Sequence, residues 1–412
     1  MSIDLNNMPK LGFGLMRLPE KDGTIDIEHL CSMVDAYMQA GMNYFDTAYV
    51  YHGGNSEKVI REALVKRYPR DRFMLATKLP AWCMKDPDDR DRIFNEQLER
   101  TGAGYFDYYW LHNLNRNSYE TAVRTDAFAF VQKKMEEGLV RHLGFSFHDS
   151  PEVLERILTE HPEVEIVQLQ INYLDWNDPI VQSGRCYEIA AAHGKLVTVM
   201  EPVKGGKLAR LPEEAEAKLR ALDPEASPAS FAIRFVASLP NVFMVLSGMS
   251  DLAQMEDNTS YMEEFVPVTE EEKAVLWECA DMIRRSKAVP CTACRYCTEG
   301  CPMQIPIPDY FALYNNVLES GGSEWTKNGS RRNYARIVDG GAGKASECLG
   351  CGLCTRQCHF EAITVTNNIA QIDYDKCKSC GLCAQKCPAH IITQRYERVR
   401  KAPAQKAEAK AE

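Results

Sequence analysis

Four ionisable side chains lie at or just after the ends of three successive predicted strands. Asp46 ends an aromatic strand, and Tyr51 lies five residues later in the loop that follows. Lys78 and His112 end the next two predicted strands. In a barrel of alternating strands and helices, the chemistry is found at the C-terminal ends of the strands. We therefore interpret these four residues as a catalytic site.

A second chemical signal is the spacing of the cysteines. The chain has 16 cysteines, and four of them precede residue 290, which leaves twelve in the C-terminal part. These twelve form three runs of identical spacing: Cys291, Cys294, Cys297 and Cys301; Cys348, Cys351, Cys354 and Cys358; and Cys377, Cys380, Cys383 and Cys387. Three cysteines two residues apart can wrap a 4Fe-4S cluster, whereas structural zinc uses other spacings. The runs predict iron–sulfur clusters, with structural zinc or free thiols as the alternatives.

Alternating strand and helix patterns position the four ionisable residues. Strands are predicted at 11–18, 44–46, 72–78, 107–112, 140–146, 166–172, 196–200 and 242–247. Helices are predicted at 26–40, 56–66, 89–100, 121–137, 151–160, 179–193, 228–239 and 270–285. Eight such alternations in roughly 250 residues are typical of a (β/α)8 TIM barrel. The fold class is therefore α/β, with a small α+β ferredoxin-like iron–sulfur region after the barrel.

The C-terminal part changes character. A helix is predicted at 309–319, a glycine- and charge-rich connector at 321–344, and a short hairpin at 362–366 and 369–373. The expected domains are a barrel at 1–285, the first cysteine run with its helix and connector at 286–345, a two-cluster domain at 346–396 and a disordered tail at 397–412.

Composition limits the partners. A chain of 412 residues is long for one domain, and its net charge of −10 argues against nucleic acid. The first residues show no secretory signal, and no stretch approaches the roughly 18 apolar residues of a membrane span. We expect a cytoplasmic protein without a nucleic-acid or membrane partner.

With the strand ends in place, residues 8–265 resemble the aldo-keto reductases, and the whole chain resembles members of that family with a C-terminal ferredoxin module. The matching stretches are 11–14, 43–48, 76–78, 110–112, 143–146, 168–172 and 246–248, with Asn258. The resemblance implies that Tyr51 protonates a carbonyl oxygen as hydride arrives. It also implies that Lys78 lowers the pKa of this phenol, that Asp46 neutralises Lys78, and that His112 orients the carbonyl.

The same resemblance implies NAD(H) or NADP(H) as cofactor. It places Ser146 and Gln168 near the nicotinamide carboxamide, and Gly248, Gln254 and Asn258 near the adenosine end. Small-molecule carbonyls are the implied substrates.

Several positions depart from the family. Phe147 and Met200 replace an asparagine and a ring that stacks on nicotinamide, and Gly248 and Gln254 stand where phosphate-reading members carry cations. A 2′-phosphate would lose its partner there, so the sequence indicates no preference for NADPH and leaves NADH, NADPH or neither open. Trp82, Trp110 and Tyr49 lie near the predicted mouth of the barrel, where core packing is the preferred interpretation over lining a substrate site.

The second and third cysteine runs resemble a bacterial two-cluster ferredoxin. This implies that Cys348, Cys351 and Cys354 bind one cluster with Cys387, and that Cys377, Cys380 and Cys383 bind the other with Cys358. The first run either holds a third cluster or pairs with the second run, as in helical ferredoxin modules.

Two functional hypotheses follow. The first is an oxidoreductase of a small carbonyl or alcohol coupled to 4Fe-4S electron transfer. Hydride moves electrons in pairs and a cluster takes them singly, so we expect a flavin, bound here or in a partner, to split the pair, and a ferredoxin or a flavoprotein as the redox partner. The second is an electron-transfer subunit whose barrel is a docking or ligand-binding scaffold for a flavoprotein. A redox-sensing binding protein is a third, weaker alternative.

Overall fold

The computed structural model describes residues 8–178, 181–285, 289, 305–319, 324–339, 363–366, 369–373 and 376. The chain divides into two compact units, Met1–Ile283 and Arg284–Glu412. All twelve cysteines of the three runs lie outside the described residues, so the predicted ligand pairings stay predictions. The predicted tail at 397–412 lies outside them as well.

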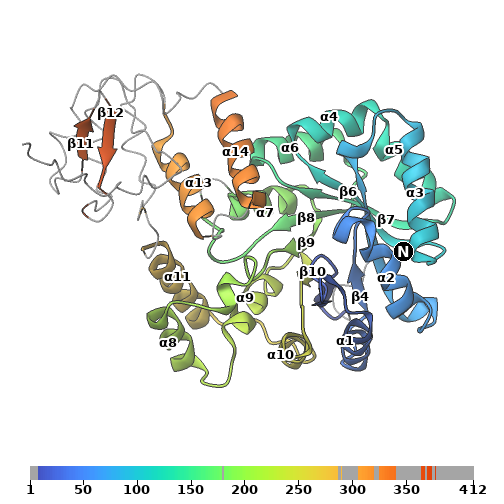
Figure 1. Cartoon of the computed structure of the whole chain (residues 1–412), viewed down its shortest axis with the longest axis horizontal. Helices are drawn as coiled ribbons and strands as arrows, with labels where there is room; N and C mark the ends of the chain where they lie inside the picture. Colours follow the sequence, from blue (N-terminus) through green and yellow to red (C-terminus); the bar gives the residue numbers. More distant parts are fainter. Residues whose placement is uncertain are drawn as a thin grey trace, which may run out of the picture. The chain divides into compact units, whose positions relative to one another are not determined.

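In the first unit, eight parallel strands close into a barrel (Figure 1). The strands are β1 (Leu11–Gly14), β4 (Tyr44–Asp46), β5 (Met74–Pro80), β6 (Phe106–Leu114), β7 (Val140–Phe147), β8 (Ile166–Gln170), β9 (Leu196–Met200) and β10 (Val242–Ser247). Consecutive strands are neighbours from β4 to β10, and β1 closes the ring by pairing with both β4 and β10. The predicted TIM barrel is confirmed.

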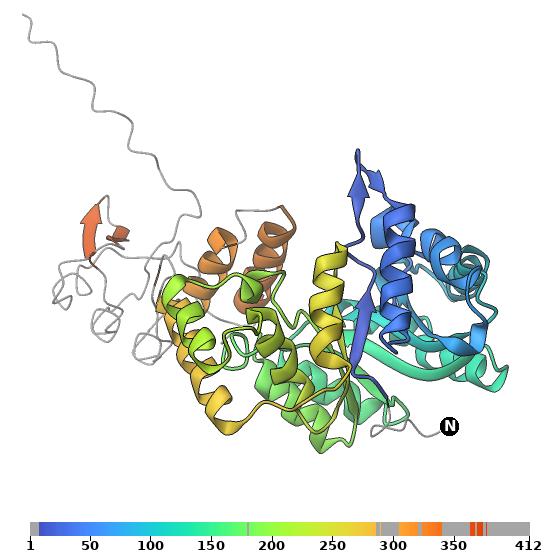
Figure 2. The same cartoon turned by 90° about the horizontal axis from the view of Figure 1, so that it is seen from below.

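Helices surround the barrel (Figure 1). They are α1 (Ile27–Gln39), α2 (Ser56–Ile60), α3 (Asp88–Thr101), α4 (Arg116–Arg124), α5 (Ala127–Glu136), α6 (Pro151–Glu160), α7 (Ser183–Ala192), α8 (Glu213–Leu222), α9 (Pro228–Ala237), α10 (Leu252–Met262) and α11 (Glu270–Arg285). Helices α1 and α10 pack side by side (Figure 2), because β1 and β10 are neighbours in the sheet. Among the described residues, no helix is both long and apolar enough to cross a membrane.

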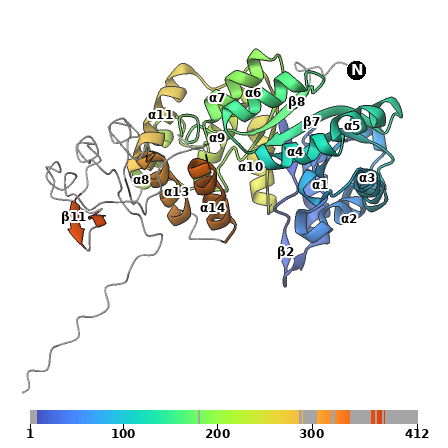
Figure 3. The same ribbon diagram turned by 90° about the horizontal axis from the view of Figure 1, so that it is seen from above.

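Several predicted elements differ in detail. The single helix predicted at 121–137 is two helices, because Asp126 has a φ of +54°, which interrupts the helical path. The first strand ends at Gly14, and the chain continues into a hairpin of β2 (Glu20–Lys21) and β3 (Thr24–Ile25) that projects from the barrel (Figure 3). Helices α8 and α10 were not predicted.

The second unit contains two helices and a hairpin. Helices α13 (Ile307–Glu319) and α14 (Glu324–Asp339) pack together, and β11 (Ile363–Thr366) pairs with β12 (Ile369–Ile372) in antiparallel fashion, as predicted. The prediction of a connector at 321–344 is wrong for 324–339, where α14 forms. The buried Asn315 amide accepts from the backbone N–H of Val289 at 3.0 Å and donates to its C=O at 2.8 Å.

The barrel interior is filled with aromatic rings at its centre. Tyr44, Tyr108, Trp110 and Phe243 pack on one another, with ring centroids 5.2 to 6.1 Å apart. Trp110 is fully buried, and its large ring fits because the neighbouring strand carries Gly144 opposite it. A Cβ on Gly144 would lie 2.1 Å from the Trp110 ring.

Replacing Gly144 with alanine should therefore destabilise the barrel. The added methyl overlaps the indole and also lies 2.7 Å from the Ile166 carbonyl oxygen, so ring and backbone must both move. We expect the free energy of unfolding to fall by about 1–3 kcal/mol or more. Thermal unfolding measures this, with Gly14→Ala as the control because its Cβ comes no closer than 3.4 Å to any neighbour. Equal melting temperatures for the two variants would contradict the prediction.

Candidate active site

Lys78, two residues before the end of β5, and Asp46, the last residue of β4, form a buried ion pair. Lys78 is 1% exposed and Asp46 2% exposed. The Lys78 ammonium binds the Asp46 carboxylate and donates to the Thr47 carbonyl at 2.7 Å. Trp110, which pairs with Lys78 in the sheet, donates from its indole N–H to the other carboxylate oxygen at 3.2 Å. Charges so far from water need such partners, and here both groups have them.

The pair keeps Lys78 positively charged. Burial lowers the pKa of Lys78, but Asp46 and Tyr51 raise it by more, so the net shift is upward. Burial raises the pKa of the Asp46 carboxyl, and Lys78 opposes this shift.

Tyr51 contacts this pair from the loop after β4. It begins a short turn, Tyr51–Gly54, in which His52 and Gly53 have positive φ values of 50° and 63°. The Lys78 Nζ lies 4.7 Å from the centre of the Tyr51 phenol ring. Burial raises the pKa of Tyr51 and Lys78 lowers it, and burial prevails. Lys78 thus lowers the pKa of the phenol, as the resemblance implied, but burial outweighs it, so the phenol keeps the proton that a general acid must carry.

His112, two residues before the end of β6, completes the group. Its ring meets Tyr51 edge-on, with the centroids 5.8 Å apart. Burial lowers the pKa of His112 well below its ordinary value, so the imidazole is neutral and can donate one hydrogen bond. Among the described residues, its buried Nδ1 has no hydrogen-bond partner. The ring centroids of Trp82 and His112 are 4.9 Å apart. Trp82 is 48% exposed, so its indole is available to a ligand.

The structure thus brings together all four residues predicted from the strand ends. A neutral phenol, a buried ammonium and a neutral imidazole lie in contact, with a carboxylate that balances the ammonium charge. This arrangement can deliver a proton and stabilise the phenolate that remains.

The predicted nicotinamide residues lie on adjacent strands. Ser146 and Gln168 are register partners on β7 and β8, and both are buried. Ser146 Oγ accepts from the backbone N–H of Asn113 at 2.7 Å, and Gln168 contacts Asp46. Phe147 is 3% exposed and packs on Phe145, so its ring belongs to the core.

The predicted adenosine residues are held by their own neighbours. Asn258 donates to Ser247 at 2.8 Å and accepts from Tyr261 at 2.6 Å. Gln254 binds both the Asp251 carboxylate and the Ser250 N–H at the start of α10. Gly248 lies against the side chain of Arg17. Arg17 was not among the site residues predicted from the sequence.

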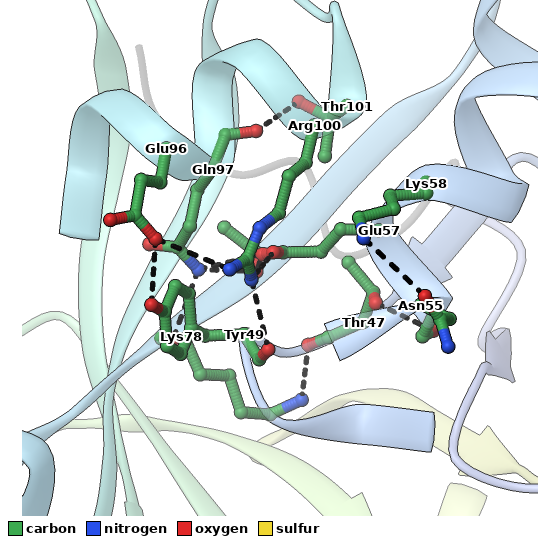
Figure 4. Close-up of polar contacts among 12 residues, drawn as sticks. Thr47, Tyr49, Asn55, Glu57, Lys58, Lys78, Glu96, Gln97, Arg100 and Thr101 are labelled. Carbon is green, nitrogen blue, oxygen red and sulfur yellow. Dashed lines mark hydrogen bonds and ion pairs between the residues drawn. The ribbon is translucent and has the colours of Figure 1, made fainter. Parts of the chain in front are cut away.

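A buried polar network behind Lys78 was also missed (Figure 4). Glu57 is fully buried and accepts from Thr77 at 2.6 Å and from the Gln97 amide at 2.7 Å. Arg100 pairs with the other Glu57 oxygen at 3.3 Å. Gln97 also donates to the Lys78 carbonyl oxygen at 3.1 Å, so the network fixes the backbone of Lys78.

Removing the Gln97 amide should loosen this support. Gln97→Met keeps the length of the side chain but leaves Glu57 and the Tyr109 hydroxyl, which donates to Gln97 at 2.6 Å, with fewer partners. We expect a loss of about 2–4 kcal/mol in the free energy of unfolding, since buried polar groups are costly to leave unpaired. Urea unfolding measures it. Glu96→Gln, at a side chain that is 34% exposed on the same helix, is the control. A loss for Gln97→Met no greater than the loss for Glu96→Gln would refute the prediction.

Comparison with known proteins identifies the barrel. The model of the "Aldo/keto reductase family" matches residues 10–281. The chain belongs to this family. Two models of a "4Fe-4S dicluster domain" match residues 290–363 and 347–391, so the chain is an oxidoreductase with iron–sulfur domains after its barrel. Both matches include the second cysteine run. The sequence left two partners open for this run, the first run and the third.

Individual relatives of the reductase are distant. "Probable aldo-keto reductase 1" of Glycine max is 30% identical over 188 residues, 42% of this chain and only 49% of the relative's own length. "D-threo-aldose 1-dehydrogenase" of a Pseudomonas species is 24% identical over 63% of this chain and 91% of its own. A solved aldo-keto reductase from Bacillus halodurans, in its holo form, superposes with a TM-score of 0.53 at 24% identity, covering 66% of this chain and 91% of its own. This last likeness supports the fold.

Proposed function

We propose that the barrel reduces a small aldehyde or ketone, or oxidises the corresponding alcohol, with a nicotinamide dinucleotide as hydride carrier. The observation that carries the proposal is the contact of Tyr51 with the buried Lys78–Asp46 pair, beside a neutral His112. A buried lysine paired with a carboxylate beside a phenol stabilises a fold no better than apolar side chains would, so the arrangement favours a functional role.

Each residue has one role in the reaction. Tyr51 donates its proton to the carbonyl oxygen, and Lys78 stabilises the phenolate that is left. Asp46 keeps Lys78 charged and in place. His112 donates a hydrogen bond that orients the carbonyl. The nicotinamide, when bound, supplies the hydride to the carbonyl carbon.

The residues on β7 and β8 suit this carrier. Ser146 and Gln168 place a hydroxyl and an amide side by side next to Asp46, where a carboxamide needs partners. The curated relatives include an "NADH-specific methylglyoxal reductase" of Escherichia coli, 24% identical over 49% of this chain and 65% of its own. NADH rather than NADPH is proposed here, because Gly248 and Gln254 offer no cation to a 2′-phosphate.

The iron–sulfur domains add single-electron chemistry. Electrons that leave as hydride reach a cluster only through a carrier that splits the pair, so a flavin, bound or in a partner protein, is part of the proposal. Three clusters are proposed if the first cysteine run holds its own, and two if it pairs with the second run.

The test is made on anaerobically purified protein with its clusters intact. NADH and NADPH are titrated, and turnover is measured with a panel of small aldehydes and ketones, while iron, sulfide and flavin are counted in the same sample. We expect binding of NADH and turnover of at least one carbonyl. Absence of both binding and turnover would refute the proposal.

One observation favours the second candidate, an electron-transfer subunit with a scaffold barrel. Phe147 is a core residue, and Met200 presents no ring, so two contacts expected for nicotinamide are missing. In that case the wild-type protein binds a flavoprotein and passes electrons to it, but retains no nicotinamide.

A further inference from the structure

The residue that follows Tyr51 has an unusual backbone conformation. His52, Gly53 and Gly54 have positive φ values of 50°, 63° and 87°, and His52 is the member of this run that carries a side chain. The left-handed region is strained for a residue with a Cβ, and glycine avoids this strain. Strain of this kind persists where the surroundings hold the residue in place, which directs attention to the contacts of the His52 imidazole.

The imidazole joins residues 47–55, here called the Tyr51 loop, to the segment that follows β1. The backbone N–H of Leu18 donates to His52 Nε2 at 3.3 Å, and His52 Nδ1 lies 3.5 Å from Glu20 Oε1. Because Nε2 accepts a hydrogen bond, the proton of the neutral ring is on Nδ1, which faces Glu20. The Glu20 side chain is 56% exposed, so its contact with His52 contributes little. The bond to the Leu18 N–H is the contact that matters.

The segment to which His52 binds is itself fixed. Leu18 is 4% exposed and packs in the hydrophobic core. Three residues earlier, the N–H of Leu15 donates to the carbonyl of Asp46 at 2.8 Å. The hydroxyl of Ser56, the first residue of α2, donates to the carbonyl of Leu15 at 3.0 Å. The Leu18 N–H is therefore a firm point of attachment for the loop.

The earlier part of the Tyr51 loop has its own support. Arg100 of α3 donates to the carbonyl of Tyr49 at 3.2 Å, and its guanidinium lies 4.1 Å from the centre of the Tyr49 ring (Figure 4). Tyr51 thus has a tethered residue on each side in the sequence, Tyr49 two positions before it and His52 directly after it. Since Tyr51 comes from a loop and not from a strand, the position of its hydroxyl depends on these two tethers.

We propose, on the basis of the proposed function, that His52 is a positioning residue for Tyr51. Its bond to the Leu18 N–H holds the Tyr51 loop so that the phenol stays beside Lys78 and His112. His52 acts through Tyr51 alone and transfers no proton in the reaction.

The test uses two substitutions that distinguish the two ring nitrogens. His52→Asn tolerates a positive φ and places its amide near the position of Nδ1, but it removes the acceptor for the Leu18 N–H. His52→Gln places its amide oxygen near the position of Nε2 and restores that acceptor. His193→Asn is the matched control, because His193 is 22% exposed and also contacts an exposed glutamate, Glu155.

Steady-state kinetics on the anaerobic holoprotein measures the effect. We expect kcat for carbonyl reduction to fall about tenfold to a hundredfold in His52→Asn, the range that a small misplacement of a reacting group causes. The KM for NADH should not change, His193→Asn should match the wild type, and His52→Gln should recover most of the lost kcat. A kcat for His52→Asn equal to that of the control, or no higher kcat in His52→Gln than in His52→Asn, would overturn the proposal.

A double-variant cycle shows whether His52 acts through Tyr51. In the Tyr51→Phe background no phenol proton remains to be positioned, so His52→Asn should lower the residual kcat no further. An equal fold loss in both backgrounds would mean that His52 supports the whole site or the fold, and the positioning role would be refuted.

Hydrogen exchange followed by mass spectrometry separates this inference from the function on which it rests. We expect the peptides that contain Leu18 and the Tyr51 loop to exchange faster in His52→Asn than in the wild type or His193→Asn. If the wild type reduces a carbonyl and the exchange of these peptides is unchanged in His52→Asn, the tether fails and the proposed function stands. If the wild type reduces no carbonyl, the proposed function fails, and the positioning role fails with it.

Discussion

Tyr51→Phe should lower kcat for carbonyl reduction by about 10²- to 10⁴-fold, the contribution of a well-placed general acid. The phenyl ring preserves the packing against Lys78 and His112, whose contacts are with the ring, but it has no proton to donate. We expect the affinity for NADH, the melting temperature and the iron content to be unchanged. Steady-state kinetics on the anaerobic protein measures the effect.

The direction of the Tyr51 pKa adds a pH criterion. Burial raises this pKa above its ordinary value of 10.0, so the acid form persists over the whole neutral range. Reduction should therefore show no loss from phenol ionisation below pH 10. Tyr49→Phe, which removes only the hydrogen bond to Glu96, is the matched control. Turnover of Tyr51→Phe close to that of the control would assign the proton to another group and favour the electron-transfer hypothesis.

Lys78→Met should lower both the free energy of unfolding and kcat. The methionine fills a similar volume but leaves the Asp46 carboxylate, 2% exposed, without its cation. Removing one partner of a buried pair typically lowers the free energy of unfolding by about 3–5 kcal/mol. We expect kcat to fall as well, because Lys78 no longer stabilises the phenolate. Urea unfolding and steady-state kinetics measure the two effects.

The pH dependence of that loss identifies its cause. Without Lys78, burial raises the folded-state pKa of Asp46 further above its ordinary value of 3.8. The folded state then binds a proton more readily than the unfolded state, so the variant loses stability as the pH rises above 3.8 through the raised value. The double variant Asp46→Asn/Lys78→Met removes the buried charge and should regain stability without regaining activity. If the double variant is no more stable than Lys78→Met, the buried charge is not the cause.

The sequence was sufficient for the barrel and for the clustering of the four candidate site residues, because both follow short-range rules. Each strand is a short apolar run, and Asp46, Lys78 and His112 occupy strand ends, which a parallel barrel brings to one face. The break at Asp126 could not be foreseen, since the apolar spacing of helix 121–137 continues across it.

Contacts between segments far apart in the chain could not be predicted from the sequence. Arg17 and Glu201 are 184 residues apart, and Gln97 meets Lys78 from a helix whose amphipathic pattern says nothing of a buried amide. Trp110 was interpreted as core, and it is, but its indole also binds Asp46. The net direction of the Tyr51 pKa depends on the depth of burial, which no spacing of residues reveals.

Two different arcs of the barrel wall carry the two proposed sets of functional residues. The proposed proton-handling residues come from β4 to β6, and the proposed carrier contacts come from β7 to β10. Because separate strands supply the two sets, mutations can accumulate in one arc while the other is conserved. Phe147, Met200 and Gly248 all fall in the second arc, so the departures from the family pattern are in the proposed hydride-carrier site, while the four proposed proton-handling residues keep that pattern.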